Sequence, residues 1–323
     1  MSRAMFEVIK GDLAKLEERL PQDVSSSVNF VTEIGTHLVT SGGKRIRPAL
    51  CILAARGGQD FSLERILPLA SALELIHTAS LVHDDVIDNA DTRRGAPTAN
   101  AKWGNKIAIL SGDFIFAQAF RLVAEGSYGD YVGQRLAELV GNLSLGEIIQ
   151  DKESYQVYSD YDNYYERIAK KTADFLEICC ELGAVVGGLS ADSCRRLSEY
   201  GHNIGMAFQI TDDLLDIQQT SEHIGKPVGN DMRQGIVTLP VIRALEVSDD
   251  AAELSAILRD RYMTDSMVER ALSIVKNSDG EEFAKRKVDE YLDLARDVLP
   301  RDLPAEVREA FALVADFIGD RDF

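Results

Sequence analysis

The sequence has few cysteines and few positive charges, and both shortages exclude classes of protein. The cysteines are Cys51, Cys179, Cys180 and Cys194, and none has the paired C-x-x-C spacing of a structural zinc site. Reduced core cysteines in a cytoplasmic protein are therefore expected. Lysine and arginine number 35 against 53 acidic residues, a formal net charge of −18. This charge opposes binding to nucleic acid or to an anionic membrane surface, so no nucleic-acid partner is expected.

Membrane and export signals are also scarce. No stretch of about 18 apolar residues runs without a charge, so no transmembrane span is expected. The N-terminus, MSRAMFEVIKGDLAKLEERL, mixes acids and bases at helical spacing and has no apolar signal-peptide core. These features again indicate a cytoplasmic protein.

Strands and low-complexity linkers are not evident, whereas helical periodicity covers most of the chain. We predict an all-α fold, a bundle of long helices in one domain over residues 1–323. The expected helices are 1–20, 24–40, 48–55, 66–88, 106–125, 131–152, 161–187, 191–219, 240–245, 251–257, 266–277, 280–298 and 304–317.

Two matching aspartate clusters follow apolar helices, and the rest of the chain is organised around them. The first and fifth positions of each cluster lie about 40° apart on a helical wheel, so two carboxylates point the same way. One acidic run alone would be read as a solvated helix end, but two with the same spacing weaken that explanation. The clusters are Asp84, Asp85 and Asp88, and Asp212, Asp213 and Asp216.

Carboxylates late in a helix repel one another and the helix dipole, so a cation is expected beside them. Oxygen ligands from a few carboxylates, with room for water and phosphate, suit Mg²⁺. Six aspartates carry six negative charges, which about three Mg²⁺ ions would balance.

Basic and glycine-rich segments accompany the clusters. Residues 41–48 read SGGKRIRP, and Arg93-Arg94-Gly95 follows the first cluster. A loop containing Lys226 and Asp231 follows the second cluster. Glycines let backbone amides approach an anion, and guanidiniums bind phosphate by paired hydrogen bonds. The arrangement predicts a cavity with metals and phosphates at its mouth and apolar helix in its body.

This set of motifs resembles the trans-isoprenyl diphosphate synthases, also called polyprenyl synthetases. The matching features are GGKRIRP, DDxxD followed by RRG, the Lys171-Thr172 pair, FQITDDLLD, and GKPVGND…TLP, in the family's order over about residues 40–240. The resemblance implies helices around a deep central cavity, usually in a homodimer, with the aspartate motifs facing each other. It also implies Mg²⁺ as cofactor, with an allylic diphosphate and isopentenyl diphosphate as substrates.

The resemblance assigns roles by position. Both aspartate motifs match metal ligands, and Asp84, Asp85, Asp88, Asp212, Asp213 and Lys171 match catalytic residues. The isopentenyl diphosphate pocket is matched by Lys44, Arg47, His77 and Arg94. The surroundings of the allylic diphosphate are matched by Arg93, Lys171, Thr172, Gln209 and Lys226.

Helix geometry and the chemistry of the reaction both agree with these assignments. His77 lies seven residues before Asp84 and within about 20° of it on the helical wheel, so it faces the same cavity. Breaking an allylic C–O bond leaves a carbocation and a diphosphate, which metal and cations stabilise while apolar walls exclude water. No side-chain nucleophile is required.

Small residues below the first cluster predict a long product. Ala79 and Ser80 lie about one turn before Asp84, where short-chain members of the family carry aromatic residues. A product of about 30 to 50 carbons needs a channel of several helical turns, since one turn rises about 5.4 Å. Candidates for the channel floor are Phe114, Phe116 and Phe120.

One position departs from the family, because Ile236 stands where many members have a lysine.

A long-chain synthase, serving quinone side chains, is the first interpretation. The alternatives are a geranylgeranyl or farnesyl synthase, and a subunit of a two-component synthase that needs a partner. A noncatalytic subunit would be expected to lose the aspartates, and a terpene cyclase would not need a second DDxxD. Release of the apolar product could involve transient membrane contact through a local apolar patch.

Overall fold

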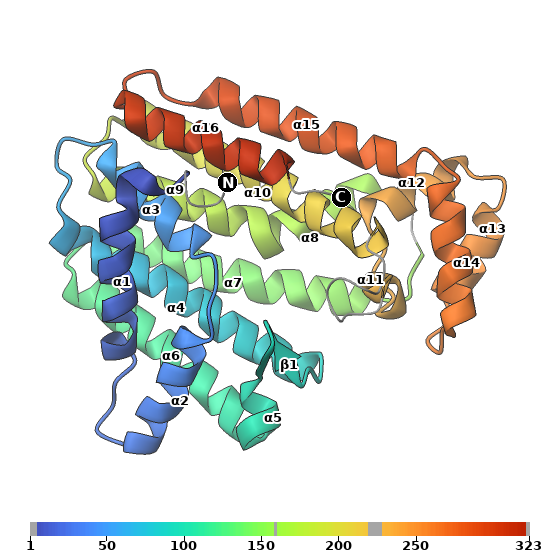
Figure 1. Ribbon diagram of the computed structural model, residues 1–323, viewed down its shortest axis with the longest axis horizontal. Helices are drawn as coiled ribbons and strands as arrows, with labels where there is room; N and C mark the ends of the chain where they lie inside the picture. Colours follow the sequence, from blue (N-terminus) through green and yellow to red (C-terminus); the bar gives the residue numbers. More distant parts are fainter. Residues whose placement is uncertain (1–4, 158–159, 219–227, 321–323) are drawn as a thin grey trace. The chain divides into compact units, whose positions relative to one another are not determined.

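A computed structural model describes residues 5–157, 160–218 and 228–320, and nearly all of their regular structure is helical (Figure 1). The all-α prediction is confirmed. The elements up to residue 125 are η1 (Glu7–Ile9), α1 (Lys10–Asp23), α2 (Asn29–Thr40), α3 (Ile46–Arg56), α4 (Leu63–Ile87), β1 (Thr92–Arg93), β2 (Ala96–Pro97), α5 (Ala99–Trp103) and α6 (Asn105–Glu125).

The remaining elements are α7 (Asp130–Glu153), α8 (Tyr161–Ile168), η2 (Ala169–Ala173), α9 (Asp174–Val186), α10 (Ala191–Gln218), α11 (Asn230–Arg233), α12 (Leu239–Val247), α13 (Ala251–Leu258), α14 (Asp265–Lys276), α15 (Gly280–Val298) and α16 (Ala305–Gly319).

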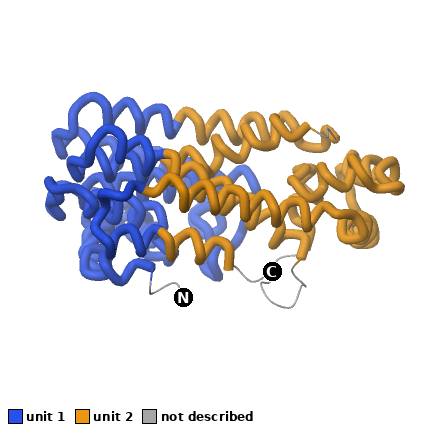
Figure 2. Tube along the Cα trace, turned by 90° about the horizontal axis from the view of Figure 1, so that it is seen from above, with its two compact units in different colours: residues 1–140, 178–198, 300–311 blue, residues 141–177, 199–299, 312–323 orange. Residues whose placement is uncertain are grey.

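The chain divides into two compact units, shown in different colours in Figure 2. Unit 1 is Met1–Val140, Ile178–Ser198 and Pro300–Phe311, and unit 2 is Gly141–Glu177, Glu199–Leu299 and Ala312–Phe323. The first aspartate motif therefore belongs to unit 1 and the second to unit 2. Expected features that involve both units, namely the common cavity and the facing motifs, stay predictions, as does the single domain.

The core of unit 1 is built on α4, which is apolar on all sides as its sequence indicates. Leu69, Leu73 and Ile76 are fully buried on it. Helix α6 lies beside α4 and presents small residues, Ala108 and Ala119, which let the two helices approach closely (Figure 1). This packing fixes the end of α4, where the first motif lies.

The second motif lies near the C-terminal end of α10. Helices α8, η2 and α9 follow one another directly, and η2 is a π-helix of five residues that contains Lys171 and Thr172. A π-turn inserts an extra residue into a helix and is frequent at functional sites. The predicted helix 161–187 is therefore present, with a local distortion that periodicity does not reveal.

Three small elements were not expected from the sequence: the β1–β2 ribbon, α5 and α11. The ribbon pairs Thr92 with Pro97 and Arg93 with Ala96 in antiparallel register. The expectation of no strand was wrong at this point because two residues a side leave no alternation to recognise.

Two helices, α4 and α6, are long and apolar enough to cross a membrane by length and composition alone. Of their apolar windows, 67% of α4 and 39% of α6 are buried inside the protein. The burial of α4 is that of a core helix.

Candidate active site

The first aspartate motif lies at the C-terminal end of α4. Asp84 is half-buried and Asp88, the C-cap residue, is exposed, and these two lie one turn apart. Asp85 is only 4% exposed, and its Oδ1 accepts a hydrogen bond from Arg93 Nε at 2.7 Å. The motif therefore has two outward carboxylates and one that is turned into the protein and neutralised.

Arg93 and Arg94 are placed by the short ribbon. Arg94 and Gly95 form its two-residue turn with φ of 52° and 79°, the left-handed pair that a type I′ hairpin requires. The Arg94 guanidinium donates to the Gly42 carbonyl. Gly43, next to this carbonyl, has φ of 152°, a backbone conformation that residues with side chains rarely adopt. The RRG and GGK segments, distant in sequence, are thus in contact.

A pocket in unit 1 is lined by residues of both segments and of α4. His77 and Asp85 come from α4, Gly42 from the glycine loop, and Arg93 and Arg94 from the ribbon. Lys44 is exposed in the described structure and is not among the lining residues. Arg94, His77 and Arg93 thus line one pocket, and their roles in binding diphosphate stay predictions.

A buried ion pair supports this pocket, and the sequence analysis missed it. Arg45 donates from Nη1 to Glu74 at 2.5 Å and from Nε to Glu17 at 2.7 Å. Its backbone is left-handed, with φ of 50°. Burial raises the pKa of Glu74, although Arg45, Arg47 and Arg94 act against this. Only the fold brings Glu74, 29 residues away, to Arg45.

His77 is neutral in this environment. Arg47 Nη1 lies 3.2 Å from His77 Nε2, and a guanidinium can only donate, so Nε2 accepts and the proton is on Nδ1. Loss of hydration and four guanidiniums, Arg47 first among them, lower the pKa of His77 well below its ordinary value. His77 therefore orients Arg47 and adds no positive charge.

In the second motif, Asp213 is 5% exposed and both its oxygens accept hydrogen bonds. Gln209 Nε2 donates to Oδ1 at 3.0 Å and the Tyr164 hydroxyl donates to Oδ2 at 2.7 Å. The Thr172 hydroxyl donates to Gln209 Oε1 at 2.6 Å, which fixes the orientation of that amide. Burial raises the pKa of Asp213 to about 6, while its two donors act in the opposite direction.

Asp212 and Asp216 are half-buried, one turn apart on α10. The Asp216 carboxylate accepts the backbone N–H groups of Asn230 and Asp231 at 3.1 Å each, and so caps the short helix α11. Withdrawal from water, and then the charges of Asp216 and Asp213, raise the pKa of Asp231 well above its ordinary value. Asp231, to which the sequence analysis gave no role, thus belongs to this acidic group.

The Lys171 ammonium lies 3.0 Å from both Glu147 Oε2 and Gln150 Oε1, two residues of α7. These partners hold a cation close to the second motif's hydrogen-bonded network. Lys226 lies outside the described residues. Ile236, in the lysine position, is half-buried, and its N–H donates to the Asp231 carbonyl at 2.8 Å.

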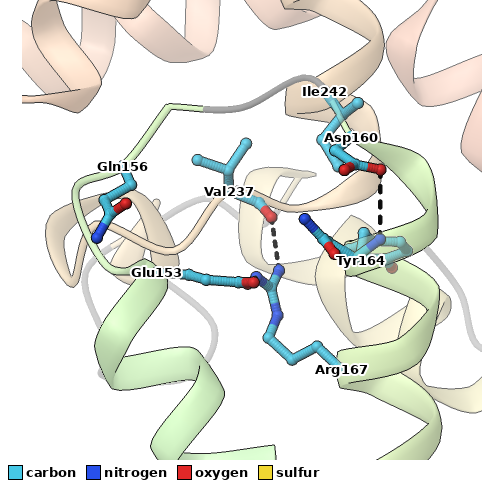
Figure 3. A pocket seen from close by; sticks show the side chains of 8 residues that line it. Glu153, Gln156, Asp160, Tyr164, Arg167, Val237 and Ile242 are labelled. Atoms are coloured by element: carbon cyan, nitrogen blue, oxygen red, sulfur yellow. Dashed lines mark hydrogen bonds and ion pairs between the residues drawn. The ribbon is translucent and has the colours of Figure 1, made fainter.

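A second, smaller pocket in unit 2 lies beside Tyr164 (Figure 3). Arg167, one turn along α8, donates to Glu153 at 3.0 Å and to the Val237 carbonyl at 2.7 Å. These bonds tie α8 to the end of α7 and to the TLP segment. Arg167 therefore helps to hold this part of unit 2 together, a role that the sequence motifs did not indicate.

Comparison with known proteins identifies the chain. The family model described as "Polyprenyl synthetase" matches residues 28–275. The chain belongs to the polyprenyl synthetase family. It is therefore a prenyltransferase.

Relatives match over nearly the full length of this synthetase. It is 41% identical over 321 residues to heptaprenyl diphosphate synthase component 2 of Geobacillus stearothermophilus, covering 99% of both chains. A decaprenyl diphosphate synthase structure from Rhodobacter capsulatus has a TM-score of 0.92 and 32% identity, covering 99% of each chain. A polyprenyl synthase from Caulobacter crescentus, complexed with calcium and isoprenyl diphosphate, has a TM-score of 0.91 and 32% identity, covering 100% of this chain and 98% of that one.

The donor sets of the synthetase fit divalent cations. Each motif combines two carboxylates that are at least partly exposed, one turn apart, with a buried third, and hard oxygen ligands suit Mg²⁺. In the second motif, burial first and neighbouring carboxylates second raise the pKa values of Asp213 and Asp231. A bound cation would relieve this repulsion.

A third group, Asp174, Glu177 and His202, brings one ligand atom of each residue within 4.8 Å of the others. Glu177 Oε2 lies 3.2 Å from His202 Nδ1, and Asn142 donates to Asp174 at 2.8 Å. Protein partners therefore account for this group without a metal.

The residues expected to set chain length differ in exposure. Ala79 is fully buried, whereas Ser80 is half-buried and donates to the His77 carbonyl at 2.9 Å. Phe120 is 36% exposed, whereas Phe114 and Phe116 are half-buried, and their place at the channel floor stays a prediction.

Proposed function

We propose that this prenyltransferase is a trans-polyprenyl diphosphate synthase that extends an allylic diphosphate, such as farnesyl diphosphate, with several isopentenyl diphosphates. The observation that carries the proposal is the pair of aspartate stripes, each beside a group of cations, in a chain 41% identical to a heptaprenyl synthase component. Ser80, a small residue one turn below Asp84, supports a long product, and a quinone side chain is the expected use.

Both aspartate motifs are proposed to bind Mg²⁺ together with the allylic diphosphate. When bound, Mg²⁺ neutralises the diphosphate and so favours cleavage of the allylic C–O bond. The number of ions, about three, is inferred from the charge of six aspartates. Crystallisation of the Caulobacter crescentus relative with calcium and isoprenyl diphosphate supports a divalent cation.

Two sets of cations are proposed to bind the two diphosphates. Lys44, Arg47 and Arg94 would hold isopentenyl diphosphate, with the neutral His77 orienting Arg47. Lys171, Arg93 and Lys226 would neutralise the leaving diphosphate, and Thr172 and Gln209 would lie beside it. Lys171 would exchange Glu147 for phosphate oxygens on binding.

The apolar body of α4 is proposed to exclude water from the carbocation. The isopentenyl double bond attacks C1 of the allylic group, a C–C bond forms, and loss of one proton to the departing diphosphate gives the trans product. No side-chain nucleophile takes part, so substitution of the aspartates or cations should slow C–O cleavage rather than trap an intermediate.

The first test is incubation of the purified protein with farnesyl diphosphate, labelled isopentenyl diphosphate and Mg²⁺, with products separated by length. A ladder ending at a long-chain product is expected, and chelation of Mg²⁺ should abolish it reversibly. Arrest at the farnesyl or geranylgeranyl stage would contradict the long-chain proposal. Synthase activity on neither short nor long primers, with or without a partner subunit, would contradict the function itself.

A second candidate is the catalytic subunit of a two-component synthase. It is supported by the name of the Geobacillus stearothermophilus relative, "component 2", and by Ile236 in the lysine position. A product ladder from the purified chain alone would exclude it. A homodimer in the cytoplasm, with transient membrane contact at product release, is our preferred state. The exposed Ile109 and Leu110 on α6 offer an apolar surface for association of the two subunits.

A further inference from the structure

Tyr164 is the one side chain of α8 that contacts the second aspartate motif among the described hydrogen bonds. Its ring is 1% exposed, and its hydroxyl donates to Asp213 Oδ2 at 2.7 Å. It comes two helical turns before Lys171, on the helix that contains the π-turn. Figure 3 shows Tyr164 and Arg167 rising from the same helix.

The contact completes a chain of directed hydrogen bonds. Thr172 donates to Gln209, Gln209 donates to Asp213 Oδ1, and Tyr164 donates to Asp213 Oδ2. A carboxylate has about four lone-pair positions, so two donors fix its plane and leave positions for a cation. Hydrogen bonds to a ligating carboxylate orient it and tune its affinity for metal.

We propose that Tyr164 is a positioning residue of the second aspartate motif, whose hydroxyl holds the Asp213 carboxylate in the orientation that binds a divalent cation with diphosphate. The inference rests on the proposed function of that motif. Loss of this hydrogen bond would cost free energy, because the Tyr164 hydroxyl and the Asp213 carboxylate would both be buried without a partner for it.

Tyr164→Phe removes only the hydroxyl, and Tyr165→Phe is the matched control. Tyr165 is the next residue on α8, is half-buried, and packs edge-on against Tyr291. Binding of Mn²⁺ in the presence of inorganic diphosphate, followed by electron paramagnetic resonance, measures cation affinity without turnover. We expect Tyr164→Phe to weaken Mn²⁺ binding about tenfold and Tyr165→Phe to leave it unchanged.

The Asp213→Asn background separates positioning from packing. If Tyr164 acts through the Asp213 carboxylate, Tyr164→Phe has no further effect on Mn²⁺ binding once that carboxylate is gone. An equal loss in both backgrounds, or wild-type affinity of Tyr164→Phe, would overturn the proposal. The melting temperature without Mn²⁺ should fall for Tyr164→Phe, because the buried Asp213 carboxylate loses a donor, and should stay at the wild-type value for Tyr165→Phe.

Should Tyr164→Phe not fold, 3-fluorotyrosine at position 164 reports the same contact by ¹⁹F resonance. A shift on addition of Mg²⁺ and diphosphate, lost in Asp213→Asn, is expected, and an unresponsive signal overturns the proposal. Because cation binding is measured without prenyl transfer, failure of the Tyr164 proposal and failure of the synthase function give different results.

Discussion

At the scale of single residues, His77 shows why charge cannot be assigned from residue type. The family role places it in a pocket for diphosphate, where a protonated histidine would seem useful. Four guanidiniums and the loss of hydration instead keep it neutral. The positive charge of the pocket comes from arginines, and the histidine accepts a hydrogen bond from one of them.

This protonation state predicts a pH dependence of stability in the substrate-free protein. In the unfolded chain His77 binds a proton below about pH 6.5, whereas in the folded chain it stays neutral. The unfolded state thus binds more protons, and stability should fall by up to about 1.4 kcal/mol per pH unit below about pH 6.5. Denaturant unfolding at pH 6.5 and 5.5 measures the loss. His77→Gln should reduce this slope, and an unchanged slope would show that other groups cause it.

Product length should respond to Ser80 rather than to Ala79. Ser80→Phe puts a ring one turn below Asp84 on a half-buried position, and we expect products shorter by one or more isoprene units. Ser80→Thr keeps the hydroxyl and should retain the wild-type length. Ala79→Phe overpacks a fully buried position and should cost about 1–3 kcal/mol of stability. An unchanged ladder from Ser80→Phe would place the channel elsewhere.

At the scale of elements, the second motif also controls a loop. Asp216 accepts two backbone N–H groups of α11, a four-residue helix that has no side-chain cap on its N-cap residue, Gly229. The motif therefore anchors the segment that follows Lys226. The same segment carries Asp231 and Ile236, so anchoring affects the surroundings of the expected allylic site.

Removal of this cap should loosen α11. We expect Asp216→Ala to speed hydrogen exchange of the amides in residues 229–233 about fivefold, since a cap is worth about 1 kcal/mol. Hydrogen exchange followed by mass spectrometry measures this. Asp212→Ala removes a carboxylate from the same stripe and should leave the exchange unchanged. Equal acceleration by both variants would mean that charge, not capping, stabilises the loop.

At the scale of the whole molecule, α6 presents apolar side chains outward. Ile109, Leu110 and Phe120 are 36–54% exposed, although α6 also packs closely on α4. A large exposed apolar face on a soluble chain usually marks an interaction surface. The strongly acidic net charge makes an anionic membrane a poor partner for this face.

Self-association through α6 predicts a clear change of mass. The wild type should be dimeric by light scattering, and Leu110→Glu should shift it towards the monomer. Leu294→Glu on α15 is the control, because Leu294 is 51% exposed against 54% for Leu110. A dimer that persists in Leu110→Glu would contradict this surface, and a wild-type monomer would favour the two-component alternative.

The long helices and the two carboxylate stripes could be predicted from the sequence, because both depend on a spacing of about 3.6 residues along one chain. Resemblance of the motifs was enough to predict the family. The pairing of Glu74 with Arg45, the contact of Tyr164 with Asp213 and the capping of α11 by Asp216 could be seen only in the folded protein. Those contacts join residues from different helices and loops, and no local periodicity encodes which buried donor meets which acceptor.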